Sequence, residues 1–424
     1  MTAISLCLAI HEPYCLRRYT VFDVGETSVY EDDDRSCQRA MYLARTCYLP
    51  LHEVLHNQIE RSEGKFRVAF SISDAALDLF EQYTPEVLDG LISLAKTGCV
   101  EFIGETGPHS LAFLYSKDEF VHLVEAHAKR LKKLFGQKPV SFRNPELLYN
   151  NDVAETIQEL GFRAILTEGS PSVLGWRNAN YVYTSSVAPK VRLLLRNPKL
   201  SATISQDFGS RGMMAEDFAN LCAMEKADIV NIFLDSHAFG LRNKKDTGIF
   251  DFLSALPNAV LQNKNLSFQT PSQVIELFEP KDSLAIPNSI SWSDEGSDLR
   301  GWLGNEMQKD ALTNCFKLTA RVHALNNEDM TKDFERLQTS DYFHYMSTSW
   351  FSESQPDRPN PFASPYDAYI SYMNILADFS RRLKIAEEEN KKNAPKEMTA
   401  DGTEQKKRVV TKRFSQSIIR RKTT

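Results

Sequence analysis

The sequence is poor in the features that mark membrane, secreted and metal-binding proteins. No apolar run approaches the roughly 20 residues needed to span a bilayer, so we expect no contact with a membrane. Residues 1–10 are apolar but lack a basic leader and a clear cleavage motif, which predicts a buried first strand and not a signal peptide. The seven cysteines form no Cys-x-x-Cys pair. This pattern favours free thiols in a reducing compartment, so the predicted location is the cytoplasm.

The charge of the chain is unevenly distributed. The whole chain has a formal net charge of −6, and residues 395–424 hold nine Lys or Arg and three Asp or Glu, so the preceding residues carry −12. An acidic body disfavours nucleic acid as a ligand. Residues 391–424 are basic and of low complexity, which predicts a disordered solubilising tail, with contact to an acidic partner as the alternative. The oligomeric state is not indicated.

Predicted strands and helices alternate through about the first 270 residues. This order is typical of an α/β protein with a parallel barrel. The segments predicted as strands are residues 4–10, 66–72, 100–103, 140–142, 162–166, 190–197, 228–234 and 267–270. Beyond residue 287, long helical runs and tryptophans become frequent. We therefore predict three parts, which are a barrel over 1–285, a helical domain over 286–390 and the tail from 391.

Polar side chains follow several of these strands. His11 comes after the first strand, Glu105 after the third, Glu146 after the fourth and Asp235 after the seventh, while Glu101 lies within the third. Strand ends in a closed barrel converge on one face, where active-site residues collect. Two facing carboxylates are the minimum for glycoside hydrolysis, with one as nucleophile or base and one as acid. Taken alone, Glu146 is also compatible with a solvated loop acid.

Several short motifs occur in order between about residues 4 and 380. They are His11-Glu12-Pro13, Gly98-Cys99-Val100-Glu101-Phe102, Phe142-Arg143-Asn144-Pro145-Glu146-Leu147, Leu234-Asp235, Phe239-Gly240, Trp302-Leu303-Gly304-Asn305, Leu337-Gln338-Thr339-Ser340-Asp341 and Ser364-Pro365-Tyr366-Asp367. In these motifs the chain resembles glycoside hydrolase family 57, in particular its α-amylase and α-amylase-like branch.

The resemblance implies an incomplete (β/α)7 TIM-like barrel followed by a C-terminal helical domain. It also implies a retaining glycosidase with no metal and no other cofactor, acting on an α-1,4-glucan such as glycogen, starch or maltooligosaccharides. Glu146 would attack the anomeric carbon, and Asp235 would protonate the departing oxygen and then activate water. The two carboxyl groups of such a pair lie about 5–5.5 Å apart. Hydrolysis and glucanotransfer share the glycosyl-enzyme intermediate, and both stay open.

The resemblance also assigns residues around the cleaved bond. The side chains expected to line the sugar are His11, Glu101 and His109. Asp341 is expected on the wall of the cleft. Trp292 and Trp302 are expected there too, with a place in the core between the two domains as the alternative.

The sequence departs from the family pattern beside Asp235. The acidic residue two positions after the acid/base of the amylase branch is His237 here, and Glu12 stands where the family has glutamine. Positions i and i+2 of a strand face the same way, so we expect the imidazole of His237 beside Asp235. A protonated imidazole would lower the pKa of Asp235, the wrong direction for a general acid, whereas a neutral one could bind a sugar hydroxyl. Two hypotheses follow, an active glycosidase and an amylase-like glucan-binding protein with weak or no hydrolytic activity.

Overall fold

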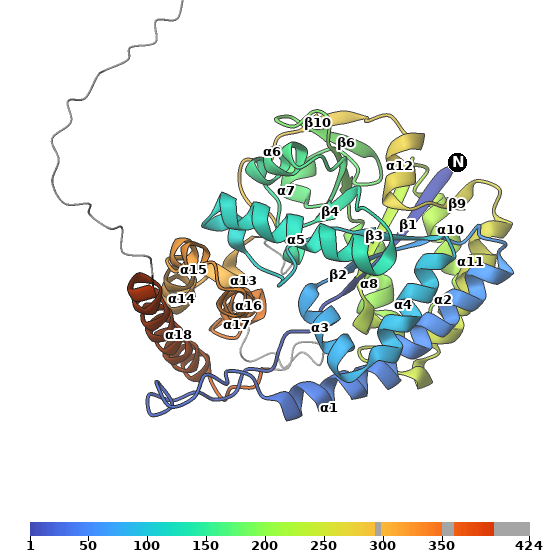
Figure 1. Ribbon diagram of the computed structural model, residues 1–424. Coiled ribbons are helices and arrows are strands. Elements are labelled where there is room, and N and C mark those ends of the chain that lie inside the picture. Colours follow the sequence, from blue (N-terminus) through green and yellow to red (C-terminus); the bar gives the residue numbers. More distant parts are fainter. Residues whose placement is uncertain (293–297, 350–359, 394–424) are drawn as a thin grey trace, which may run out of the picture.

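The computed structural model describes residues 1–292, 298–349 and 360–393, and Figure 1 shows their arrangement. The strands of these residues are β1 (Thr2–Ile10), β2 (Val68–Ile72), β3 (Val100–Ile103), β4 (Ser141–Arg143), β5 (Ala164–Thr167), β6 (Val182–Ser185), β7 (Arg192–Leu195), β8 (Ile229–Asp235), β9 (Leu266–Phe268) and β10 (Asp282–Leu284).

Seven parallel strands follow one another in the order β8-β1-β2-β3-β4-β5-β7. A bridge between Gly104 and Phe142 continues the sheet from β3 to β4. Between β7 and β8 there is no ladder, and the two strand regions meet through a 2.8 Å hydrogen bond from Asn197 N to Asn231 O. This is the predicted fold class, an α/β protein with an incomplete (β/α)7 TIM-like barrel, open between β7 and β8.

Three further strands lie outside this ring. β9 pairs with the start of β1, β6 runs antiparallel to β7, and β10 pairs with β6. β9 was expected at 267–270, but β6 and β10 were not predicted. The reason is local, because two of the three residues of β10 are exposed and β6 ends in two hydroxyl side chains, so neither is the apolar run that located the other short strands.

Amphipathic helices cover the strands from outside. They are α1 (Asp33–Leu43), α2 (Leu49–Arg61), α3 (Asp74–Tyr83), α4 (Pro85–Lys96), α5 (Lys117–Phe135), α6 (Asn151–Glu159), α7 (Pro171–Leu174), α8 (Pro198–Ser205), α9 (Phe208–Arg211), α10 (Ala215–Met224), α11 (Ile249–Gln262) and α12 (Pro271–Leu277). All nine residues of β1 are buried, as expected for a parallel strand covered on both faces. No helix in the described part of the chain is long and apolar enough to cross a bilayer.

Among the described residues after β10 the regular elements are helices, and Figure 1 shows them gathered at one side of the strands. They are α13 (Arg300–Leu303), α14 (Glu306–Phe316), α15 (Thr319–Leu325), α16 (Glu328–Leu337), α17 (Ser340–His344) and α18 (Pro365–Asn393). Side chains of these helices share one hydrophobic core with β4, β5 and β7. The division at residue 285 stays a prediction. Of the predicted tail, 391–393 belong to α18 and the remainder lies outside the described residues.

Candidate active site

Glu146 lies in a tight turn directly after β4. The turn is η3 (Pro145–Leu147), a short 3-10 segment, and within it both Glu146 and Leu147 have left-handed backbone, with φ of +59° and +52°. Consecutive non-glycine residues in this region are uncommon and tend to occur at functional sites. The Glu146 side chain is 2% exposed, so the alternative of a solvated loop acid is wrong.

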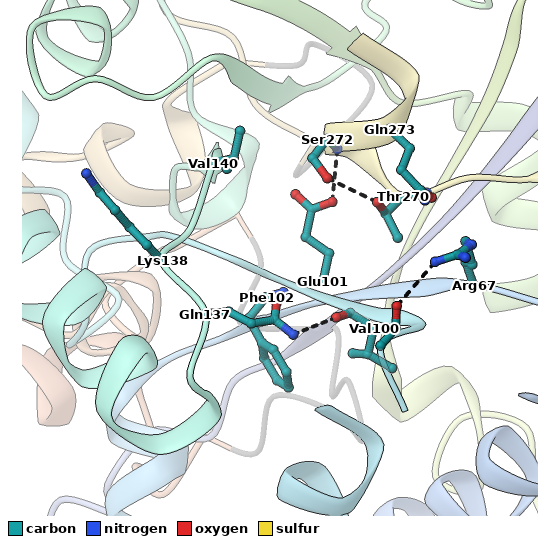
Figure 2. A pocket seen from close by; sticks show the side chains of 11 residues that line it. Arg67, Val100, Glu101, Phe102, Gln137, Lys138, Val140, Thr270, Ser272 and Gln273 are labelled. Atoms are coloured by element: carbon teal, nitrogen blue, oxygen red, sulfur yellow. Dashed lines mark hydrogen bonds between the residues drawn. The ribbon is translucent and has the colours of Figure 1, made fainter. Parts of the chain in front are cut away.

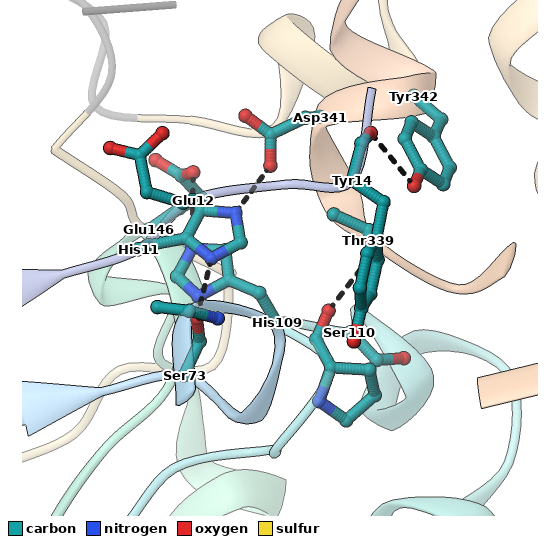
Figure 3. Close-up of polar contacts among 12 residues, drawn as sticks. His11, Glu12, Tyr14, Ser73, His109, Ser110, Glu146, Thr339, Asp341 and Tyr342 are labelled. Carbon is teal, nitrogen blue, oxygen red and sulfur yellow. Dashed lines mark hydrogen bonds and ion pairs between the residues drawn. The ribbon is translucent and has the colours of Figure 1, made fainter. Parts of the chain in front are cut away.

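Two donors hold the buried carboxylate of Glu146. Trp292 Nε1 donates to Oε2 at 2.8 Å, and His109 Nε2 lies 3.4 Å from Oε1. Figure 3 shows the imidazole of His109 and the carboxylate of Glu146 in one cluster. His109 itself has left-handed backbone, with φ of +61°. A buried carboxylate is stable in its charged form only with such partners.

Behind His109 lies a second buried acid, Glu105. Its Oε1 is 3.0 Å from His109 Nδ1, and its Oε2 accepts from Ser71 Oγ at 2.6 Å and from Arg143 Nη1 at 3.2 Å. Burial opposes ionisation of Glu105, but His109 and Arg143 outweigh it and lower its pKa to about 2. Burial also disfavours the charged form of His109, yet Glu105 and Glu146 raise the pKa of this imidazole. His109 therefore lies between two carboxylates that favour its protonated form.

His11 joins the barrel to the helices after β10. Its Nε2 is 2.7 Å from Asp341 Oδ2 in α17, and its Nδ1 is 2.8 Å from Ser73 Oγ. The ring stacks on that of His109 at 3.7 Å between centroids (Figure 3). Burial and the neighbouring cation of His109 lower the pKa of His11, so this imidazole is neutral. The structure thus brings the predicted site residues His11, His109 and Asp341 together around Glu146.

Asp235 is the last residue of β8 and faces partly exposed space. Its Oδ1 accepts from His237 N at 2.9 Å and so caps η4 (Ser236–Ala238), a 3-10 turn. His237 does lie beside Asp235, with Nδ1 3.3 Å from Oδ1. The strand argument for this contact is wrong, however, because the chain has left the strand at Asp235. The turn that Asp235 caps brings the imidazole back towards it.

The other ring nitrogen of His237 contacts a further buried acid. His237 Nε2 donates to Glu12 Oε1, and Tyr48 OH lies 2.9 Å from the same oxygen and 3.0 Å from Nε2. Glu12 Oε2 accepts from Arg39 Nε at 2.8 Å. Burial opposes both charges. Asp235 and Glu12 nevertheless raise the pKa of His237 to about 9, and Arg39 and His237 lower that of Glu12 to about 2.

No motif or spacing in the sequence indicated Arg39 and Tyr48. Arg39 lies in α1, and Tyr48 ends η1 (Ala44–Tyr48), a π-helical segment between α1 and α2. π-Helical turns are rare and frequently occur at functional sites. Gly240 packs against this turn, and a Cβ at Gly240 would lie 1.9 Å from the carbonyl oxygen of Thr46.

Glu101 lies apart from the other predicted site residues. Its Oε1 accepts from Ser141 Oγ at 2.6 Å and its Oε2 from Ser272 N at 2.9 Å. Figure 2 shows it in a separate pocket with Gln137 and Arg67. Glu101 is the second residue of β3, so it precedes Glu105 by four positions, roughly 13 Å along an extended chain. The expectation that it lines the sugar therefore gains no support from its position.

The two tryptophans occupy different environments. Trp292 is partly exposed, contacts Glu146, and its ring lies 5.4 Å from that of Phe233 in β8. It therefore connects the end of β4 with the strand that carries Asp235. Trp302 is 0% exposed in the core formed with the C-terminal helices, and its Nε1 has no hydrogen-bond partner among the described residues. This is the core position given as the alternative for Trp302.

The geometry describes a strand-end site with a buried carboxylate, Glu146, in the turn after β4 and a more exposed carboxylate, Asp235, at the end of β8. A model described as Glycosyl hydrolase family 57 matches residues 5–287. The chain belongs to glycosyl hydrolase family 57. A relative from Methanocaldococcus jannaschii described as "Putative alpha-amylase" is 35% identical over 411 residues, which cover 92% of this chain and 87% of the relative.

Three solved structures share the fold of this chain. A GH57 branching enzyme from Thermococcus kodakaraensis superposes with a TM-score of 0.68 at 14% identity, covering 93% of this chain and 94% of that one. The α-amylase AmyC from Thermotoga maritima gives 0.60 at 13% identity, covering 92% and 93%. The 4-alpha-glucanotransferase from Thermococcus litoralis gives 0.68 at 13% identity, and here 90% of this chain matches 60% of a longer one.

Proposed function

We propose that this family 57 protein is a retaining glycosidase acting on α-1,4-glucans, with Glu146 as nucleophile and Asp235 as acid/base. The observation that carries the proposal is the state of Glu146, a carboxylate buried after β4 and held by Trp292 Nε1 and His109. Donors on both oxygens keep such a group ionised and oriented, as a nucleophile must be at neutral pH. Asp235 ends β8 and keeps 28% of its side chain exposed, which suits a group that meets substrate and water.

The reaction would proceed in two steps. Glu146 forms a bond to the anomeric carbon while the glycosidic bond breaks, and the departing oxygen takes the proton of Asp235. Asp235, now a carboxylate, removes a proton from an acceptor hydroxyl, which attacks the anomeric carbon and releases Glu146. The acceptor is water in hydrolysis and a sugar hydroxyl in transfer. His109 and Trp292 would hold the carboxylate of Glu146 in line for attack.

Other features of the chain agree with a glucan-active enzyme of the cell interior. The M. jannaschii relative supports an α-glucan as substrate, and the net charge of −12 before residue 395 argues against nucleic acid. All seven cysteines are free thiols, in accord with the predicted reducing location, the cytoplasm. Because the site joins His11 to Asp341 of α17, we propose that residues 286–390 complete the cleft.

The decisive experiment compares three glutamate variants on maltooligosaccharides and glycogen. Glu146→Gln should lower kcat at least about a thousandfold, since a nucleophile cannot be replaced by its amide. The matched control is Glu101→Gln, which changes another buried glutamate of the barrel and should stay near wild type. Glu105→Gln should fall between them, because it loosens His109. Equal rates for Glu146→Gln and wild type would refute the assignment.

The stereochemistry of the product tests the retaining mechanism. Proton NMR of the first product should show the α-anomer, and Asp235→Asn should regain turnover with azide while forming an α-glycosyl azide. An initial β-anomer would exclude Glu146 as a covalent nucleophile. Chain-length analysis of the same digests separates hydrolysis from transfer, because only transfer produces oligosaccharides longer than the substrate.

The contact between His237 and Asp235 supports a second candidate function. The imidazole of His237 lies 3.3 Å from Asp235, at a position where the family has an acid, so the surroundings of the proposed acid/base are altered. In this second function the protein would bind α-glucan and hydrolyse it weakly or not at all. Saturable binding of maltooligosaccharides with turnover equal to that of Glu146→Gln would establish this function.

A further inference from the structure

Three residues from three segments are linked to the acid/base residue by one chain of contacts. Arg39 of α1 contacts Glu12, which follows β1, and Glu12 contacts His237 of η4, which contacts Asp235. Glu12 and His237 are each 1% exposed, so solvent does not screen their charges. The sequence distance between them is 225 residues, and no pattern within either segment indicates the pair.

The contacts of His237 define its protonation. One ring nitrogen donates to the carboxylate of Glu12, and the other faces the carboxylate of Asp235 at 3.3 Å, without hydrogen-bond geometry. A lone pair on that second nitrogen would be repelled by Asp235, so the doubly protonated imidazole fits both neighbours. The other titratable groups that face the pair include Arg39, Tyr48 and the thiols of Cys15 and Cys47.

The charge balance resolves the difficulty that His237 creates for a general acid. An isolated imidazolium would disfavour a proton on Asp235, but Glu12 sits against the same ring with the opposite charge. Arg39 in turn limits the effect of Glu12. The main-chain N–H of His237 still fixes Oδ1 of Asp235 at 2.9 Å, so this residue orients Asp235 whatever the charge of the ring.

We propose that Glu12 is a positioning residue for the acid/base: it holds His237 in place beside Asp235 and offsets its charge, so that Asp235 can carry a proton. This inference rests on the proposed role of Asp235. On this inference, Glu12 acts through His237 on the basic limb of the pH–rate profile. This is the limb on which the acid/base loses its proton.

The test makes opposite charge changes at Glu12 and at its ion-pair partner Arg39. Glu12→Gln removes a negative charge and should move the basic limb of kcat/KM to lower pH by about one unit, a tenfold fall in proton affinity. Arg39→Gln removes a positive charge and should move the same limb to higher pH. The matched control is Tyr48→Phe, which removes a hydrogen bond to Glu12 without changing charge and should move the limb less than either. Glu12→Asp, which restores the charge, should restore the limb.

A second readout does not depend on activity. NMR titration of protein labelled at its nine histidines, with His237 assigned from the spectrum of His237→Gln, should show the imidazole pKa falling in Glu12→Gln and rising in Arg39→Gln. If the wild type proves inactive on glucans, the proposed function fails and this titration still decides the inference. If Glu12→Gln does not fold, Arg39→Gln decides it alone. Shifts in the same direction for both variants, or no shift, would overturn the role of Glu12.

Discussion

Replacement of Trp292 by phenylalanine removes one donor from the candidate nucleophile and keeps an aromatic ring in its place. The lost hydrogen bond, from Nε1 to Glu146 Oε2, measures 2.8 Å and ends on a buried charge. Hydrogen bonds to charged groups contribute about 1.5–3 kcal/mol. Trp292→Phe should therefore lower kcat/KM by about 10- to 150-fold.

The same substitution should also change the pH dependence. With one donor fewer, the charged form of Glu146 is less favoured, so the acid limb of the pH–rate profile should move to higher pH by about one to two units. The assay is initial-rate kinetics on a maltooligosaccharide across the pH range, at a temperature far below unfolding of either variant.

Trp302→Phe is the matched control for this prediction. It removes the same atoms from a tryptophan that is fully buried and whose Nε1 has no hydrogen-bond partner among the described residues. We expect Trp302→Phe to lower stability and to leave the acid limb unmoved. If the two variants have the same kcat/KM and the same acid limb, Trp292 does not act on Glu146 and the argument fails.

Three further predictions concern stability and the altered neighbours of the acid/base. The depressed pKa of Glu105 stabilises the fold by about 3 kcal/mol above pH 4.5, and this contribution should be lost as the pH falls from 4.5 towards 2. In urea unfolding, the stability of Glu105→Gln should therefore depend less on pH in this range than that of the wild type. In the same assay, Gly240→Ala should lower the free energy of unfolding by about 2–4 kcal/mol, because its Cβ meets a main-chain carbonyl. Gly248→Ala, also at positive φ but in open space, should lower it by about 1 kcal/mol. Equal losses for the two variants would contradict the steric argument. His237→Glu should lower activity, because it places a third carboxylate beside Glu12 and Asp235. Adding Glu12→Gln to this variant should recover part of the lost activity. If His237→Glu alone is faster than the wild type, the imidazole does not contribute to activity.

Much of the architecture could be predicted from local sequence. Apolar runs bounded by capping residues located β1, β2, β3, β5 and β8, and their alternation with helices indicated the parallel barrel. The ordered motifs indicated the family. Glu146 at the end of β4 followed from the same local reasoning, because a strand end and the turn after it are properties of a few neighbouring residues.

The partners of the site residues could not be predicted in this way. Of the two acids in and after β3, only the fold shows that Glu105 contacts His109 while Glu101 lies four residues earlier on the strand. Of two predicted tryptophans, only packing decides that Trp292 reaches Glu146 and that Trp302 lies in the core.

The same division holds beside Asp235. The sequence by itself determined that an imidazole follows Asp235, the proposed acid/base, at a position where the family has an acid. Tertiary structure alone decided that Glu12, 225 residues earlier, meets this imidazole and balances its charge. The physical reason is that periodicity and caps act between residues a few positions apart, whereas buried charges are paired by whichever strand ends the open barrel brings together.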